Sequence, residues 1–349
     1  MRLRARQFRE KSPIPIKVKR FFLGAVIMIK YFYKDNKSEK VRLFNEFRSG
    51  CWIHVESPTP SEITFLREKF NLSAGLLRDA LDIYEVPRLE IEEGQTYIFT
   101  RFAYWQSPKV QLSAYAPNGY KGETTLISTE PVLIILGDKF LMTFSLNPLP
   151  FMKDLLEDGN FYTTKKISLF FKIFVKIHYI YNTFLHNIAR LIRSTTIELE
   201  KINNKDIIQF VTYESVLNDF LTALEPTNVI LKNLFSGKFL KLTDQEKEWV
   251  EDLYFSNSQL IELSQANLRN IVNIREAYST IITNNLNRVI RLLTSLTVIL
   301  AVPTMIASIY GMNIDLPFDH SPNAFFIIIS AIVFIASALL FIFLKKRWL

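Results

Sequence analysis

The chain has 349 residues, 49% of them hydrophobic, and its 42 basic residues exceed its 34 acidic residues to give a formal net charge of +8. The mean hydropathy of +0.12 makes it more apolar than many soluble proteins, which favours a membrane protein with a large soluble part. Several of the excess positive charges lie in residues 1–20 and beside an apolar C-terminal region, a distribution that indicates membrane orientation and contact with anionic lipid rather than nucleic-acid binding.

The side-chain inventory excludes several kinds of chemistry. Cys51 is the only cysteine, so an intrachain disulfide and a zinc site built from several thiolates are both excluded. The four histidines are scattered, and the sequence contains no HExxH motif, no nucleophile elbow and no glycine-rich phosphate loop. We therefore predict that the chain is not an enzyme and that it binds no nucleotide, nucleic acid or organic cofactor.

Residues 1–27 form an N-terminal extension that superficially resembles a signal peptide, because arginines and lysines precede the apolar run 21–29. The run is short and no small-residue cleavage pattern follows it, so we predict that it is not a signal peptide. Met28 opens a stretch that would make a natural start. We hypothesise that residues 1–27 result from a misassigned translation start.

Residues 28–150 show the mixed pattern of an α/β domain. The sequence predicts helices over 61–70 and 75–83, and apolar strands that helices would cover. Gly137 and Asp138 lie between two of these strands and predict a tight hairpin turn, because both residue types tolerate a positive φ. The predicted strands span 52–56, 97–104, 132–136 and 140–145.

Residues 151–242 have a long helical pattern with expected breaks near Asn203, at Pro226 and around Gly237. The stretch 167–192 within it is rich in Phe and Ile. Charged residues interrupt this stretch at intervals that place them on one helical face, so we predict an amphipathic helix rather than a membrane span.

A long helix is predicted to begin at Thr243. Thr243 and Glu246 have the spacing of a capping box, and neither Pro nor Gly occurs again before Pro303. A single helix of about 100 Å therefore continues from a stalk, 243–289, into an apolar segment, 290–310. Polar residues intersperse the apolar positions of the stalk, so the helix requires other copies of itself as packing partners.

Two apolar segments, 290–310 and 324–344, each have about the twenty residues that cross a bilayer. The intervening loop, 311–323, contains no Lys or Arg. Basic residues flank the opposite ends of both spans, including the tail, 345–349. The positive-inside rule therefore predicts a hairpin with both chain termini in the cytoplasm and the loop outside.

The run Ile309-Tyr310-Gly311-Met312-Asn313, placed between two such spans, resembles the CorA family of magnesium transport proteins, as do the basic tail and the stretches 52–58 and 77–90. The resemblance implies an α+β fold with a cytoplasmic α/β domain, a helical stalk and a transmembrane hairpin, assembled as a funnel-shaped homopentamer in the plasma membrane. It also implies Mg²⁺ uptake driven by the membrane potential, with admission of Co²⁺ or Ni²⁺.

Small, hydroxyl, amide and apolar side chains recur at helical intervals along the first span and match the pore face of that family. Ordinary close packing of membrane helices is the alternative explanation for such a stripe. The predicted pore-lining residues are Asn287, Ile290, Leu293, Thr294, Thr297, Ala301, Thr304 and Ser308. Ile290 and Leu293 match the position of an apolar gate, and Pro303 frees a backbone carbonyl or simply kinks the helix.

Gly311, Met312 and Asn313 are the predicted selectivity filter. Mg²⁺ gives up its waters reluctantly, so a ring of Asn313 amides can accept hydrogen bonds from the hydrated ion. A helix C-cap formed by Gly311 and Asn313 is the alternative. Asp315 and Asp319 in the outer loop either raise the local cation concentration or are simply solvated.

The resemblance also implies a regulatory Mg²⁺ shared between subunits. Asp79 and Asp252 match the two acidic positions that hold it in the family, so that falling internal Mg²⁺ would open the channel. Plain solvation is the alternative for either residue. Arg78 departs from the family pattern and weakens the expected site, so sensing would be weaker or rest on Asp82, Glu85 or Glu251.

Two other functions remain open from the sequence. One is transport of a different divalent cation, as in the zinc transporters that share this architecture, although Met312 favours Mg²⁺. The other is a membrane-anchored scaffold or sensor whose hairpin only tethers it.

Overall fold

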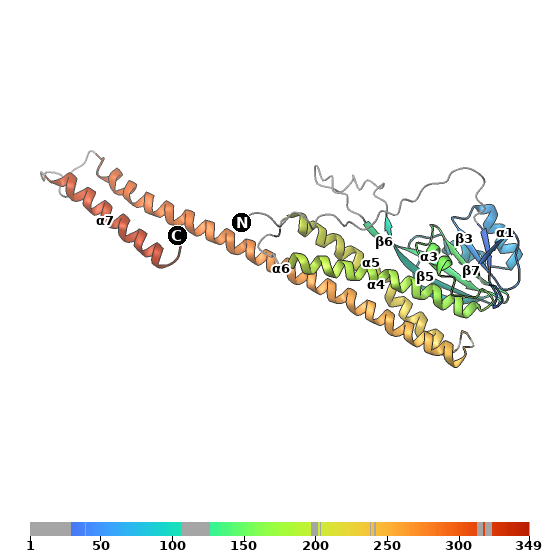
Figure 1. Ribbon diagram of the computed structural model, residues 1–349. Coiled ribbons are helices and arrows are strands. Elements are labelled where there is room, and N and C mark those ends of the chain that lie inside the picture. Colours follow the sequence, from blue (N-terminus) through green and yellow to red (C-terminus); the bar gives the residue numbers. More distant parts are fainter. Residues whose placement is uncertain are drawn as a thin grey trace, which may run out of the picture. The chain divides into compact units, whose positions relative to one another are not determined.

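The computed structural model describes residues 29–38, 40–106, 126–196, 202, 204–237, 239–240, 242–312, 317 and 323–348 (Figure 1). The chain divides into two compact units, and each unit is built from several segments of the sequence. Unit 1 contains residues 1–104, 129–178 and 226–255, and unit 2 contains residues 105–128, 179–225 and 256–349. The predictions made for residues 1–27 lie outside the described residues.

Unit 1 is built on a seven-stranded mixed sheet of order β2-β1-β3-β7-β6-β5-β4. The strands β3 and β7 pair in parallel, whereas β1–β2, β1–β3, β4–β5 and β6–β7 are antiparallel. The α/β pattern and all four predicted strands are confirmed. The strands are β1 (Ile29–Tyr33), β2 (Arg42–Phe44), β3 (Cys51–Glu56), β4 (Arg88–Glu92), β5 (Gln95–Gln106), β6 (Leu126–Leu136) and β7 (Phe140–Ser145).

Both faces of the central strands are buried, which explains their nearly continuous apolar sequences. Helices α1 (Pro60–Phe70) and α2 (Ala74–Asp79) contribute Leu66, Phe70 and Leu77 to the core over one face. On the other face, the ring of Trp52 lies 5.9 Å from that of Phe161. A capping box begins α1, with the Thr59 amide donating to Glu62 at 2.8 Å.

The β4–β5 and β6–β7 hairpin turns of the sheet depend on glycine for different reasons. Glu93 and Gly94 join β4 to β5 and both have positive φ, at 51° and 73°, as in a type I′ turn. Gly137 lacks a positive φ, so the predicted reason for a glycine there is wrong. A Cβ on Gly137 would instead lie 2.5 Å from the Phe140 ring, so close packing requires the glycine.

The remaining helices are α3 (Met152–Asp158), α4 (Lys166–Thr196), α5 (Asn204–Phe235), α6 (Asp244–Ile309) and α7 (Ala324–Lys345). The amphipathic helix predicted over 167–192 is confirmed as α4. The break predicted at Pro226 is wrong, because α5 continues through it. Near the proline, Leu224 is 2% exposed and its carbonyl accepts a 2.8 Å hydrogen bond from Asn257 Nδ2. This packing outweighs the loss of the one backbone hydrogen bond that Pro226 cannot donate.

The predicted long helix is confirmed as α6, which has 66 residues. Its capping box forms as expected: the Thr243 amide donates to Glu246 at 2.8 Å, and the Glu246 amide donates to the Thr243 hydroxyl at 3.4 Å. At about 1.5 Å per residue the helix extends about 100 Å without interruption.

A buried polar group in the sheet contains His54, which is 1% exposed. The Trp52 indole donates to the Thr143 hydroxyl at 2.9 Å, and His54 Nδ1 lies 2.9 Å from the same oxygen. Nε2 of His54 lies 3.4 Å from the Glu56 carboxylate. Burial lowers the pKa of His54, and Glu56 opposes only part of that effect.

Because the pKa of His54 is lowered on folding, the unfolded chain binds a proton more readily than the native state below about pH 6.5. We therefore expect the free energy of unfolding to be highest above that pH, and to fall by about 1 kcal/mol when the pH is lowered by the next unit. His54→Gln should remove most of this dependence, measured as the thermal midpoint of the full-length protein in detergent between about pH 7.5 and 5.5. The matched control is His186→Gln, at an exposed position of α4, and an equal effect of the two substitutions would contradict the prediction.

Candidate functional site

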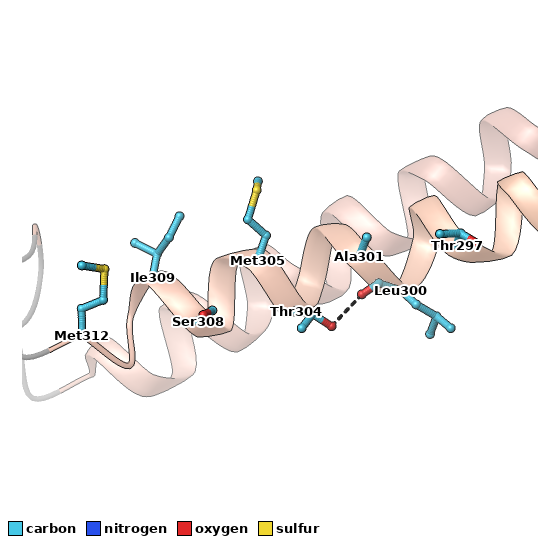
Figure 2. A pocket seen from close by; sticks show the side chains of 8 residues that line it. All are labelled: Thr297, Leu300, Ala301, Thr304, Met305, Ser308, Ile309 and Met312. Carbon is cyan, nitrogen blue, oxygen red and sulfur yellow. Dashed lines mark hydrogen bonds between the residues drawn. The ribbon is translucent and has the colours of Figure 1, made fainter.

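Two helices in the described residues are long and apolar enough to cross a membrane, α6 and α7. Their apolar side chains are exposed in the single chain, as Leu300 at 60% and Phe334 at 75% illustrate. Helix α7 returns beside the last turns of α6 (Figure 1; Figure 2). The two long apolar helices expected near the C-terminus are thus confirmed, and among the described helices α4 is not apolar enough to be a third.

All eight residues of the predicted stripe lie on exposed positions of α6. Because successive helical residues are about 100° apart, these positions share one side of the helix. Four of them line a single groove of about 710 Å³ near the C-terminal end of α6 (Figure 2). These four are Thr297, Ala301, Thr304 and Ser308. The other four, Asn287, Ile290, Leu293 and Thr294, lie on earlier turns and outside the groove.

Hydroxyl groups give this face its polar character. Thr297 Oγ1 donates to the Leu293 carbonyl at 2.9 Å. Thr304 Oγ1 donates to the Leu300 carbonyl at 2.8 Å, as Figure 2 shows. Since each hydroxyl proton is used by the helix, the oxygen lone pairs remain as acceptors for water. The face can therefore accept hydrogen bonds from the hydration shell of a cation.

Apolar residues complete the groove, and three of them were not predicted: Leu300, Met305 and Ile309. Each lies three or four positions from a residue of the predicted stripe or filter. Including these neighbours, which lie one helical turn away, would have found them. Figure 2 also shows Met312 beyond the end of the helix, in line with Ile309 and Met305. The groove thus has a hydroxyl-bearing strip bordered by apolar side chains.

The Gly-Met-Asn run follows α6 directly. The amides of Gly311 and Met312 donate to the carbonyls of Ser308 and Ile309, each at 3.2 Å, so the chain leaves the helix in tight turns. Gly311 lacks the left-handed φ of a glycine C-cap. Asn313, Asp315 and Asp319 lie outside the described residues.

The second predicted site centres on Asp79, the last residue of α2. The predicted helix over 75–83 is therefore too long. Residues 80–85 form turns, because Arg101 donates to the carbonyls of Ile83 and Glu85 at 3.0 and 2.7 Å and holds them outside a helix. The carboxylate of Asp82 caps the Tyr84 amide at 2.9 Å within the same turns.

Residues 80–87 form an acidic loop between α2 and β4, and Arg88, the first residue of β4, contacts carboxylates on both sides of it. Its Nη2 lies 2.7 Å from Asp79 Oδ2, and it also forms ion pairs with Glu85 and Glu90. The guanidinium stacks over the Phe99 ring at 4.2 Å. The sequence analysis did not identify Arg88. The signal in the sequence was a basic residue close to Asp79, Glu85 and Glu90, with which it pairs.

A regulatory Mg²⁺ fits this arrangement poorly. Asp79 already shares one oxygen with a guanidinium, and Asp252 lies exposed on α6. Within the described ranges, no group of three or more His, Cys, Asp or Glu side chains is placed to hold a metal ion. The single chain therefore does not present Asp79 as a free ligand.

The chain thus combines an α/β unit, a long helix and a second apolar helix, and two of its helices are long and apolar enough to cross a membrane. The chain belongs to the CorA-like Mg²⁺ transporter protein family, which matches residues 48–346. The resemblance expected from the sequence is thereby confirmed.

Two curated relatives cover nearly the whole chain. The cobalt/magnesium transport protein CorA of Methanocaldococcus jannaschii is 25% identical over 88% of this chain and 93% of its own length. The magnesium transport protein CorA of Helicobacter pylori is 24% identical over 92% of this chain and 100% of its own length.

Solved structures show the same fold. The complete CorA magnesium transporter from M. jannaschii aligns with a TM-score of 0.77 and 21% identity, covering 93% of this chain and 100% of that one. The ZntB cytoplasmic domain from Vibrio parahaemolyticus aligns with a TM-score of 0.56 and 10% identity, covering 73% of this chain and 98% of that one.

The exposed stripe predicts a water-accessible face of α6 in the membrane-embedded protein. Thr304→Cys and Ser308→Cys should react with a membrane-impermeant cationic thiol reagent about tenfold or more faster than Ser295→Cys. Ser295 is fully buried and bonds to the Arg291 carbonyl as Thr304 does to that of Leu300. Mass spectrometry of the reconstituted protein measures the modification.

The native Cys51 should not react with the reagent in this experiment, because its thiol is buried and burial raises its pKa. Equal rates at all three introduced cysteines would show that the stripe is only a packing surface.

Proposed function

We propose that this chain forms a membrane channel for divalent cations, with Mg²⁺ as its main cargo and Co²⁺ or Ni²⁺ as further ones. The observation that carries the proposal is the stripe of hydroxyl and small side chains on α6, which leads directly to Gly311 and Met312. Membership of the CorA-like Mg²⁺ transporter family and the names of both curated relatives support it.

The channel requires several copies of the chain. One stripe on one helix cannot surround an ion, but identical helices around an axis can present their stripes to a common pore. We propose a homopentamer, as the family resemblance implies, in the plasma membrane. The basic residues Arg288, Arg291 and Lys345 to Arg347 favour an orientation with both termini in the cytoplasm.

Selection would take place at Gly311, Met312 and Asn313. Mg²⁺ holds its waters firmly, so amide and carbonyl oxygens that accept hydrogen bonds from a hydrated ion avoid the cost of stripping it. The hydroxyl oxygens of Thr304 and Thr297 continue this series of acceptors along α6. A neutral lining also lets the ion leave, whereas a ring of carboxylates would hold it.

The membrane potential supplies the driving force. A divalent cation moving inward gains about 4.6 kcal/mol per 100 mV, twice the value for a single charge. Asp315 and Asp319 in the outer loop would concentrate cations at the entrance. At the cytoplasmic end, Ile290 and Leu293 form an apolar constriction that closes the pore by dewetting.

The likeness to the ZntB cytoplasmic domain concerns the fold and does not decide the cargo. A zinc channel and a membrane-anchored scaffold therefore remain as outcomes of the experiments. A scaffold would tolerate loss of Asn313, and a zinc channel would carry zinc in preference to Mg²⁺ in reconstituted vesicles.

Asn313→Ala tests the filter. The wild-type chain should restore growth of a strain deficient in Mg²⁺ transport, and the variant should not, with Mg²⁺ uptake into vesicles reduced about tenfold or more because the amide acceptors are lost. Asn323→Ala is the matched control, since that residue precedes α7 and its side chain makes no capping bond. Full growth of the Asn313 variant would refute a filter at this position.

Leu293→Ser tests the apolar gate. A hydroxyl at the constriction stabilises water there, so Mg²⁺ currents under closing conditions should rise about threefold or more. The matched control is Leu292→Ser, which changes a leucine on another side of α6. Leu292 is 47% exposed and Leu293 is 61% exposed. Planar-bilayer recordings measure both, and equal currents in the two variants would place the gate elsewhere.

A further inference from the structure

We propose that Arg88 takes the place of a divalent cation at Asp79, so that Asp79 has no part in control by internal Mg²⁺ while Arg88 is present. This inference rests on the proposed function, because it concerns how the channel is regulated. It replaces the expectation that Asp79 and Asp252 share a regulatory ion.

The first step is the contact itself. Arg88 Nη2 lies 2.7 Å from Asp79 Oδ2, which is the distance of a charge-assisted hydrogen bond. The same guanidinium pairs through Nη1 with Glu85 and through Nε with Glu90. One cation of the chain thus serves three carboxylates, using all three of its nitrogen atoms.

The second step is that Arg88 is held in place. Its guanidinium stacks on Phe99, a β5 residue that is 1% exposed, and its backbone is paired directly with Phe99 in the sheet. The Arg88 side chain is 31% exposed and that of Asp79 is 43% exposed, so water screens the contact only in part. Because guanidinium groups do not lose their proton in proteins, this positive charge is permanent.

The third step concerns the loop. Arg101 donates to the carbonyls of Ile83 and Glu85 and also to the Thr129 carbonyl, at 2.7 Å, so the loop is tied to strand β6. The turns that follow Asp79 are therefore held against the sheet whose strand β4 carries Arg88. A Mg²⁺ ion, which requires oxygen ligands in near-octahedral geometry, would have to displace the guanidinium from Asp79 or bind the other carboxylate oxygen against the repulsion of a neighbouring positive charge.

The prediction is that Asp79→Asn leaves the response to internal Mg²⁺ unchanged in the otherwise wild-type chain. Removing the guanidinium should reverse this: Arg88→Gln should lower the half-inhibiting Mg²⁺ concentration about fivefold, and Asp79→Asn added to it should cancel the shift. Currents of the full-length protein in planar bilayers, with Mg²⁺ graded on the cytoplasmic side, measure the effect. Asp138→Asn and Arg67→Gln, two changes at other sites in unit 1, are the matched controls.

A second readout does not depend on conduction. The Mg²⁺-induced shift of the thermal midpoint in detergent should be the same for wild type and Asp79→Asn, and larger for Arg88→Gln. A wild-type protein that assembles but passes no divalent cation would overturn the proposed function, whereas the thermal shifts would still decide the role of Arg88.

Two results would overturn the inference. One is a loss of Mg²⁺ response in Asp79→Asn alone, which needs no Arg88 variant and so does not depend on how that variant folds. The other is a folded Arg88→Gln protein whose response to Mg²⁺ equals that of wild type.

Discussion

The constraint on which the rest of this protein depends is that a bilayer offers no hydrogen-bond partners to the backbone. Helix α6 meets it by remaining helical from Asp244 to Ile309, with Thr243 and Glu246 satisfying its first amides. The same continuity carries the helix from its capping box into the apolar segment without a break.

The hydroxyl groups in the membrane show how a small chemical feature serves two purposes. Thr297 and Thr304 give their protons to the helix and so incur little cost in an apolar environment. Their oxygens remain acceptors, which suits a cargo whose hydration shell presents hydrogens outward. A face of this kind offers hydrogen-bond acceptors without the negative charge that would trap a divalent cation.

The acidic loop of unit 1 follows different physics. Arg88 neutralises part of a cluster of carboxylates, and Arg101 binds backbone carbonyls of the same loop. Two permanent cations thus organise a segment in which several apolar side chains are exposed. The loop presents Ile83, Tyr84 and Val86 to solvent at 46%, 84% and 52% exposure, which is a further sign that its conformation is imposed by polar contacts.

Periodicity and capping signals in the sequence by themselves determined four of the seven strands of the sheet, the amphipathic α4, the start of α6 and the pair of long apolar C-terminal helices, because each depends on local chemistry that repeats along the chain. Only the tertiary structure decided that α5 passes through Pro226, that Gly137 is needed for contact with Phe140, that α2 ends at Asp79 and that Arg88 pairs with it. These features arise from contacts with other elements or neighbouring turns, or from packing that overrides propensity. No pattern within a single segment contains that information.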